Sequence, residues 1–125
     1  MKKIVNTEKA PKPIGPYNQA VMVNNTLYVS GQIPMDPATS ELVKGDVKQQ
    51  THRVMENIKA ILSEAGMDFN DVVKCSIFIS DMKDFPLINE VYGKYFTEDA
   101  PARETVQVAG LPLAVDVEIS CIAVI

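Results

Sequence analysis

The chain has 125 residues, of which 46% are hydrophobic and 22% charged, and its formal net charge is -4. This length fits one domain over residues 1–125, and no apolar run approaches the roughly 20 residues of a membrane span. The acidic balance argues against a nucleic-acid partner, and the N-terminal segment lacks the long apolar stretch of a secretory signal. We therefore expect a cytoplasmic protein that binds neither nucleic acid nor membrane.

The chain begins with a short β-rich run and continues into a loop. The segment KKIVN (residues 2–6) is typical of a strand. The following segment, KAPKPIGPYNQAV (9–21), contains three prolines and a glycine, which exclude regular structure as far as Pro16. This pattern predicts a first strand followed by a rigid loop.

Two further β-rich runs follow the loop, QAVMV (19–23) and TLYVSG (26–31). Asn24 and Asn25 separate them, and asparagine tolerates the positive φ of a tight turn. The sequence therefore predicts a β-hairpin here.

The middle of the chain changes from a period of two to a helical period. From Asp46 onward apolar residues recur at steps of three and four, and Gly66 ends the pattern. The run DVVKCSIFIS (71–80) is apolar on both faces, as expected of a strand inside a sheet. A second helix is predicted after Asp84, which can cap it, with Pro86 in the first turn.

The last two predicted strands are ETVQVA (104–109) and VDVEISCIAV (115–124), joined by a turn at residues 110–112. The order β-β-β-α-β-α-β-β favours an α+β domain in which two helices cover one face of a mixed sheet. The other face keeps apolar side chains that need cover. An oligomer is the simplest way to supply it.

The two cysteines, Cys75 and Cys121, lie far apart in the sequence among β-branched residues. Neither belongs to a CxxC pair or to a Cys/His spacing that would hold a metal. Free cysteines of this kind are usually buried as small apolar side chains. We expect both thiols to be buried and reduced.

Two opposite charges stand out in the C-terminal strands. If these strands pair as an antiparallel hairpin, Arg103 faces Glu118 and Thr105 faces Asp116, because paired positions keep a constant index sum. Alternation then places the four side chains on one polar face of the sheet. A solvated cross-strand ion pair would contribute roughly 0.2–1 kcal/mol and need no function. From the residues alone, the structural and the functional interpretation stay equally open.

Six stretches of the sequence together resemble the RidA/YjgF family of reactive-intermediate deaminases, and the similarity runs nearly end to end. They are IGPYNQAV, YVSGQIP, VKQQTHRVMENIKAILSEAG, INEVYGKYF, PARETVQV and LPLAVDVEISCIAV. The resemblance implies a chorismate-mutase-like fold and a homotrimer with a ligand cleft between adjacent subunits.

The same resemblance implies a hydrolase that needs neither a metal nor an organic cofactor. Its substrates would be short 2-aminoenoic acids and their 2-imino tautomers, such as 2-iminobutanoate and 2-iminopropanoate, which pyridoxal-phosphate dehydratases release. Its products would be a 2-oxo acid and ammonia. The function expected from the resemblance is therefore that of an enamine/imine deaminase.

Such a reaction gives Arg103 and Glu118 separate roles. The planar guanidinium of Arg103 can hold the substrate carboxylate through two parallel hydrogen bonds. Glu118 matches the family's catalytic glutamate, and a carboxylate within reach of a water can orient it and accept its proton. We expect these two residues to be catalytic.

Four other residues match the family's pocket. Tyr17 would lie near the ligand, Ser30 and Gly31 would approach it through a hydroxyl and a backbone N–H, and Asn89 would reach the cleft from the neighbouring subunit. Packing or helix surface would explain Tyr17 and Asn89 as well. His52 lies off the apolar stripe of its helix, and we expect it to face solvent without a catalytic role.

Three positions depart from the common family pattern: Glu104, Thr105 and Ser120 stand where many relatives have serine, cysteine and glutamate. By alternation Glu104 should point away from Arg103, so the carboxylate grip need not be lost. Thr105 is expected in the substrate pocket, where its branched side chain could reshape the cavity. The departures leave the preferred substrate open.

Two other functions remain open at this stage. A non-catalytic regulatory protein could hold a small carboxylate in the same cleft and signal its occupancy to a partner. RNA cleavage or binding is associated with some members of the family. The acidic charge and the absence of a basic cluster make the second alternative the weaker one.

Overall fold

The computed structural model describes all 125 residues and contains six β-strands, two α-helices and three 3-10 turns. The strands are β1 (Lys2–Val5), β2 (Ala20–Val23), β3 (Thr26–Gln32), β4 (Val72–Ile79), β5 (Ala102–Gln107) and β6 (Val117–Val124). The helices are α1 (Val47–Glu64) and α2 (Phe85–Tyr95), and the 3-10 turns are η1 (Phe69–Asp71), η2 (Met82–Asp84) and η3 (Pro112–Ala114).

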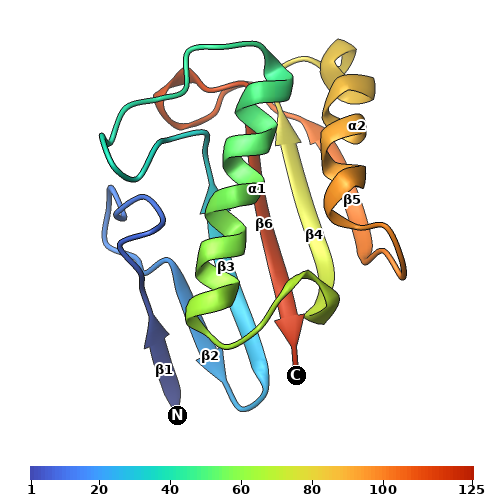
Figure 1. Cartoon of the computed structure of the whole chain (residues 1–125). Helices are drawn as coiled ribbons and strands as arrows, with labels where there is room; N and C mark the ends of the chain where they lie inside the picture. The colour runs from blue at the N-terminus through green and yellow to red at the C-terminus, as the bar shows by residue number, and fades with distance from the viewer.

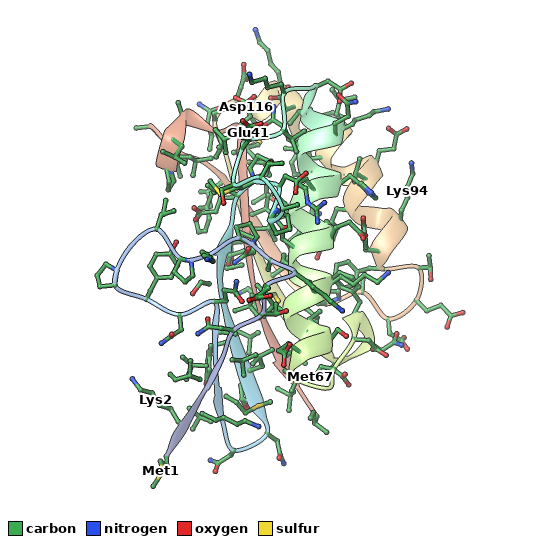
Figure 2. The ribbon with its side chains drawn as sticks, turned by 60° about the vertical axis from the view of Figure 1, so that its left-hand side comes forward. Met1, Lys2, Glu41, Met67, Lys94 and Asp116 are labelled. Atoms are coloured by element: carbon green, nitrogen blue, oxygen red, sulfur yellow. The ribbon has the colours of Figure 1, made fainter.

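All six strands form one mixed sheet in the order β1-β2-β3-β6-β4-β5. Only the pair β4 and β5 is parallel, and every other neighbouring pair is antiparallel. Both helices lie on the same face of the sheet (Figures 1 and 2). The predicted α+β class, with a mixed sheet and two helices on one face, is confirmed.

Helix α1 begins and ends where the sequence pattern predicts. The Asp46 side chain accepts a hydrogen bond from the backbone N–H of Gln49, and the Gln49 side chain accepts one from the backbone N–H of Asp46. This reciprocal cap satisfies two N–H groups that have no partner inside the helix. After the helix, Gly66 adopts a φ of +75°, a conformation that glycine takes without strain.

The predicted hairpin is confirmed as β2 and β3, which pair with Val23 opposite Thr26. Asn24 in the two-residue turn has a φ of 53°, the positive value that asparagine tolerates.

The predicted hairpin of the two C-terminal strands is wrong. Helix α2 returns the chain from the end of β4 to its start, so β5 pairs with β4 in parallel, with Arg103 beside Cys75. This is a βαβ crossover, which a helix between two strands favours. Strand β6 then inserts between β3 and β4 (Figure 1). The connection from β5 to β6 is correspondingly longer than a turn and includes η3, where Leu113 has a φ of 55°.

The predicted cap of the second helix needs a smaller correction. Asp84 precedes the first residue of α2, but it has helical φ and ψ values and its side chain caps nothing. The turn η2 leads directly into α2, and Asp81 accepts the hydrogen bond from the backbone N–H of Lys83 at 2.9 Å. Pro86 lies in the first turn of α2, as predicted.

The core fills the layer between the helices and the sheet. It includes the apolar face of α1 and alternate residues of β4 and β6. Cys75 and Cys121 are both buried and free, as predicted, and they face each other across β4 and β6.

The other face of the sheet is open. Its apolar side chains are only partly covered: Tyr28 is 50% exposed and Val106 is 43% exposed. Ion-paired and hydroxyl side chains lie between them, such as Lys74 and Glu104, whose charged groups are 2.8 Å apart. In a single chain no helix covers this face (Figure 1). Neither helix combines the length and the apolar character required to span a membrane.

Candidate functional site

A β-bulge in β3 builds the first part of the site. Val29 pairs with Cys121 and Gln32 pairs with Ile119, so two residues of β3, Ser30 and Gly31, oppose Ser120 alone on β6. Such a bulge bends its strand and redirects neighbouring side chains. Here it places Gly31 against the side chain of Glu118.

The contact between Gly31 and Glu118 is close enough to require glycine. A Cβ atom built on Gly31 would lie 2.6 Å from Oε2 of Glu118 and 2.7 Å from its carboxylate carbon. Real Cβ atoms do not approach other heavy atoms so closely. Any larger residue at position 31 would therefore displace the carboxylate of Glu118.

Glu118 is half-buried and its carboxylate forms neither an ion pair nor a hydrogen bond with the chain. Burial raises the pKa of this carboxyl group above the usual glutamate value. The side chain lines a hollow of about 310 Å³ together with Tyr17, Ser30, Gly31 and Pro112. We call these five residues the Glu118 half-site.

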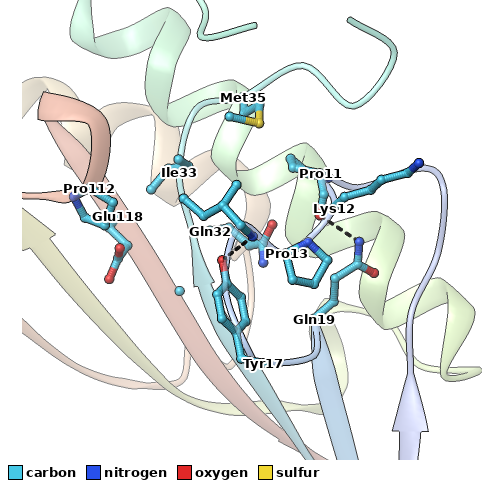
Figure 3. A pocket seen from close by; sticks show the side chains of 12 residues that line it. Pro11, Lys12, Pro13, Tyr17, Gln19, Gln32, Ile33, Met35, Pro112 and Glu118 are labelled. Atoms are coloured by element: carbon cyan, nitrogen blue, oxygen red, sulfur yellow. Dashed lines mark hydrogen bonds between the residues drawn. The ribbon is translucent and has the colours of Figure 1, made fainter. Parts of the chain in front are cut away.

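A narrower cavity of about 50 Å³ adjoins this hollow and shares Tyr17, Gly31, Pro112 and Glu118 with it. Glu118 and Pro112 lie on one side, and Tyr17 and the loop containing Pro11 and Pro13 lie on the other (Figure 3). A site for one water needs roughly 10–15 Å³ of such volume, so water can occupy the cavity beside the carboxylate.

The loop that carries Tyr17 is held by side chains on its inner side. Gln19 is buried; its amide oxygen accepts a hydrogen bond from the backbone N–H of Thr7 at 2.7 Å, and its amide nitrogen donates to the Pro11 carbonyl at 2.8 Å. The Tyr17 hydroxyl accepts a hydrogen bond from the backbone N–H of Ile14 at 3.3 Å (Figure 3). Its own hydrogen remains free to donate to a ligand.

The hydroxyl and the backbone N–H of Ser30 both donate hydrogen bonds within the chain, which differs from the role expected for Ser30 toward a ligand. Its hydroxyl donates to the Asn18 carbonyl at 2.6 Å, so toward a ligand it can only accept a hydrogen bond. The backbone N–H of Ser30 also binds within the chain, to the Gln19 carbonyl. Ser30 therefore fixes the loop as well as lining the hollow.

Arg103 lies on β5 with its guanidinium over two aromatic rings of α2. The guanidinium carbon is 4.9 Å from the ring centre of Tyr92 and 5.6 Å from that of Phe85. Both distances fall within the range of a cation–π contact. The two ion pairs of the chain, Lys48 with Glu90 and Lys74 with Glu104, do not involve Arg103.

Asn89 and Thr105 accompany Arg103. Asn89 lies on the same stripe of α2 as the two rings, four residues after Phe85 and three before Tyr92, so all three share one helical face. Thr105 follows Arg103 on the same face of β5, and its hydroxyl is buried without a partner. We call Phe85, Asn89, Tyr92, Arg103 and Thr105 the Arg103 half-site.

The two half-sites lie on separate surfaces of the chain. Strand β4 separates β5 from β6, and it pairs through Cys75 with Arg103 and through Phe78 with Glu118. Residues three apart in a strand point to opposite faces, so Arg103 lies on the helix-covered face and Glu118 on the open one. The predicted shared face for Arg103 and Glu118 is wrong within one chain.

Asp116, predicted to face Thr105, has a structural role. Its carboxylate accepts hydrogen bonds from the Ser80 hydroxyl at 2.9 Å and from the Gln50 side chain at 3.0 Å. It thereby ties the beginning of β6 to β4 and α1. His52 is exposed, as predicted, and its Nδ1 lies 2.7 Å from the Tyr95 hydroxyl.

Sequence reasoning missed two residues of the Arg103 half-site, Phe85 and Tyr92. Their spacing of seven residues marked them as helix core, and nothing in that spacing indicated a guanidinium. The parallel pairing of β5 with β4 was the missing information, because it sets Arg103 under α2. No three His, Cys, Asp or Glu side chains come together in an arrangement that could hold a metal ion.

Comparisons with known proteins agree over nearly the whole chain. A family model described as Endoribonuclease L-PSP matches residues 7–125. A RutC family protein of Pyrococcus abyssi is 57% identical over 122 residues, which cover 98% of this chain and 96% of that protein. The 2-iminobutanoate/2-iminopropanoate deaminase of Bos taurus is 48% identical over 124 residues, covering 99% of this chain and 90% of that protein.

Solved structures show the same fold. RidA from the Antarctic bacterium Psychrobacter sp. PAMC 21119 matches with a TM-score of 0.95 and 48% sequence identity, over 98% of this chain and 99% of that one. Both half-sites fall inside the region that the family model matches. The chain therefore belongs to the RidA/RutC family, whose sequence model carries the description Endoribonuclease L-PSP.

Proposed function

We propose that this protein is a 2-iminobutanoate/2-iminopropanoate deaminase, which hydrolyses the enamines and imines released by pyridoxal-phosphate dehydratases. We further propose that it acts as a homotrimer in which the Arg103 half-site of one copy closes over the Glu118 half-site of the next. The observation that carries the proposal is the pair of half-sites, a cation without an anion and a half-buried carboxylate without a partner, on two surfaces of one chain.

The Arg103 half-site has the chemistry to bind a small carboxylic acid. A partly buried guanidinium with no anionic partner is costly, and a ligand carboxylate would supply the missing charge. The planar fork can form two parallel hydrogen bonds with it, which fixes the orientation of the acid. A 2-imino acid carries such a carboxylate next to its reactive carbon.

The Glu118 half-site has the chemistry to activate water. As the water oxygen bonds to the carbon of the C=N group, Glu118 accepts the water proton. The raised pKa of Glu118 suits this task, because a proton acceptor works best when its pKa lies close to the pH of the reaction. Glu118 returns this proton to the nitrogen, which gives a carbinolamine. The hydroxyl proton of the carbinolamine then also moves to the nitrogen, so that ammonia leaves and the carbon becomes the carbonyl of the 2-oxo acid.

The open face of the sheet supports the proposed oligomer. It carries partly exposed apolar side chains across several strands, including Tyr28 and Val106, and a neighbouring copy would cover them. Closed rings of identical subunits form when one surface of a copy binds a different surface of the next. The two half-sites are a pair of different surfaces of this kind.

The charge of the chain does not support RNA as the substrate, although the family model carries an endoribonuclease description. The net charge is -4, and the Arg103 half-site holds one cation among aromatic and polar side chains. Binding to a phosphate backbone requires several cations along one surface. A small acid fits this half-site better.

The three departures from the family pattern have different consequences. Glu104 pairs with Lys74 on the open face and points away from Arg103, as alternation predicts. Ser120 lies opposite the bulge that holds Gly31. Thr105 is the departure closest to the proposed substrate, and its buried, unpartnered hydroxyl is the group most able to affect substrate preference.

The first prediction concerns Arg103. We expect Arg103→Ala to lose roughly 2–5 kcal/mol of transition-state binding, and Arg103→Lys to restore little, because an ammonium cannot reproduce the planar fork. The assay uses a serine or threonine dehydratase to generate 2-aminoacrylate or its homologue and measures the rate of 2-oxo acid formation. Arg53→Lys, on α1, is the matched control. Full activity in Arg103→Lys would contradict bidentate binding.

The second prediction concerns Glu118. Glu118→Gln should still bind 2-oxobutanoate but should no longer accelerate ammonia release. If the protein only senses the acid, the same substitution should change neither ligand binding nor any other measured property. In the wild type the rate should fall as the pH drops through the raised pKa of Glu118, because only the carboxylate accepts a proton.

The stability of the same variant provides a folding control. A carboxyl group whose pKa is raised by folding destabilises the native state when it is charged. The melting temperature of Glu118→Gln at neutral pH should therefore equal or exceed that of the wild type. A marked decrease would indicate a structural role for Glu118.

The third prediction concerns Gly31. Gly31→Ala should displace the Glu118 carboxylate and lower kcat by about 10²-fold, the usual effect of an error of about 1 Å in a catalytic group. The fold should persist, because the clash is with the end of a flexible side chain. Gly93→Ala, in the exposed part of α2 with open space around it, is the matched control and should retain full activity. Equal activity of the two variants would contradict the proposed placement of Glu118.

A further inference from the structure

The rings of Phe85 and Tyr92 together form an aromatic platform that contacts Arg103. Phe85 and Tyr92 lie two turns apart on α2, and the guanidinium carbon of Arg103 lies within 5.6 Å of both ring centres. The rings thus contact the cation from the helix side. Arg103 reaches them from β5, an edge strand that pairs only with β4.

The rings hold the cation without occupying its donors. The attraction between a cation and an aromatic face acts on the charge of the guanidinium as a whole, and no hydrogen bond or ion pair within the chain uses the side-chain N–H groups of Arg103. A carboxylate from the chain would hold Arg103 through those N–H groups and would compete with a ligand acid. The adjacent carboxylate, Glu104, instead binds Lys74 on the other face of the sheet.

The platform is itself fixed by the core. Tyr92 is 6% exposed, and its ring packs against Phe96 at a tilt of 43°, with 4.8 Å between the ring centres. Phe96 packs in turn against Phe69, edge to face, at 5.3 Å. This aromatic chain connects the platform to the segment between α1 and β4, so the ring of Tyr92 has little freedom to move.

The Tyr92 hydroxyl contributes little to this arrangement. It is buried without a hydrogen-bond partner and lies beside the Cys75 thiol. Burial and the nearby thiol raise the pKa of this phenol, so it stays neutral. The ring of Tyr92, and not its oxygen, is therefore the group that acts on Arg103.

We propose that Phe85 and Tyr92 are positioning residues, which hold the guanidinium of Arg103 against their rings and leave its side-chain N–H groups free for the carboxylate of the substrate. The identity of that acid rests on the proposed function. The positioning of Arg103 does not, because it is a property of the unliganded chain.

The first test needs neither ligand nor activity. Protons held over an aromatic ring resonate upfield, so the side-chain protons of Arg103 should show ring-current shifts in the NMR spectrum of the wild-type protein. Tyr92→Phe should keep these shifts, and Tyr92→Leu should lose most of them. Phe85→Leu, at a less buried position, should lose part of them. Unshifted Arg103 protons in the wild type would overturn the proposal.

The second test measures binding of 2-oxobutanoate, the proposed product. Tyr92→Leu should weaken binding by roughly 2- to 30-fold, which corresponds to a cation–π contact of about 0.5–2 kcal/mol. Tyr92→Phe should bind like the wild type. In the coupled assay the loss in Tyr92→Leu should raise KM more than it lowers kcat, because the ring acts on the residue that binds the acid.

Tyr95→Leu provides the matched control on the same helix. The Tyr95 hydroxyl donates to Glu56 and contacts His52, away from Arg103, so this variant should keep both the shifts and the affinity. If Tyr95→Leu loses as much of the shifts and affinity as Tyr92→Leu, the cause is a less stable helix, and the proposal is overturned. If Tyr92→Phe loses as much, the cause is the Tyr92 hydroxyl and not its ring, and the proposal is likewise overturned. Persistent ring-current shifts in a protein that binds no 2-oxo acid would support the positioning and refute the proposed function alone.

Discussion

The crossover from β4 through α2 to β5 determines where both half-sites lie. It makes β5 parallel to β4, so β6 can pair only on the other side of β4. The pairing of β4 with both neighbours then fixes the faces, because Arg103 is in register with Cys75 and Glu118 with Phe78. The chain thus separates the guanidinium of Arg103 from the carboxylate of Glu118, and in the proposed reaction neither half-site alone could both hold an imino acid and deliver water to it.

Each half-site is built to keep one reactive group without an internal partner. Gly31 leaves room for the Glu118 carboxylate, and no residue of the chain neutralises it. The rings of Phe85 and Tyr92 hold Arg103 in place, so no carboxylate of the chain is needed to do so. Both arrangements reduce the stability of the isolated chain, since unpaired charges that are partly buried are unfavourable. In the proposed trimer, the substrate and the neighbouring copy supply what each surface lacks.

Local patterns predicted the elements, and non-local pairing decided the site. The period of α1, the cap at Asp46 and the turn at Asn24 are encoded within a few residues, and all three were predicted correctly. The register of β5 depends on contacts with β4 across an intervening helix, and no local pattern reveals it. The predicted Arg103–Glu118 hairpin failed for that reason. The contact between Gly31 and Glu118 was equally hidden, because it arises from a bulge between strands about 90 residues apart in sequence.

In the proposed trimer each active site takes Arg103 from one copy and Glu118 from another. Unfolding Arg103→Ala and Glu118→Gln together, refolding the equimolar mixture and measuring imine hydrolysis would test this arrangement. Each variant alone should be inactive. In randomly mixed rings about a quarter of the clefts would combine an intact Arg103 with an intact Glu118, so about a quarter of the wild-type activity should return. If the mixture is as inactive as its components, in rings shown to contain both variants, then no active site combines Arg103 and Glu118 from different copies.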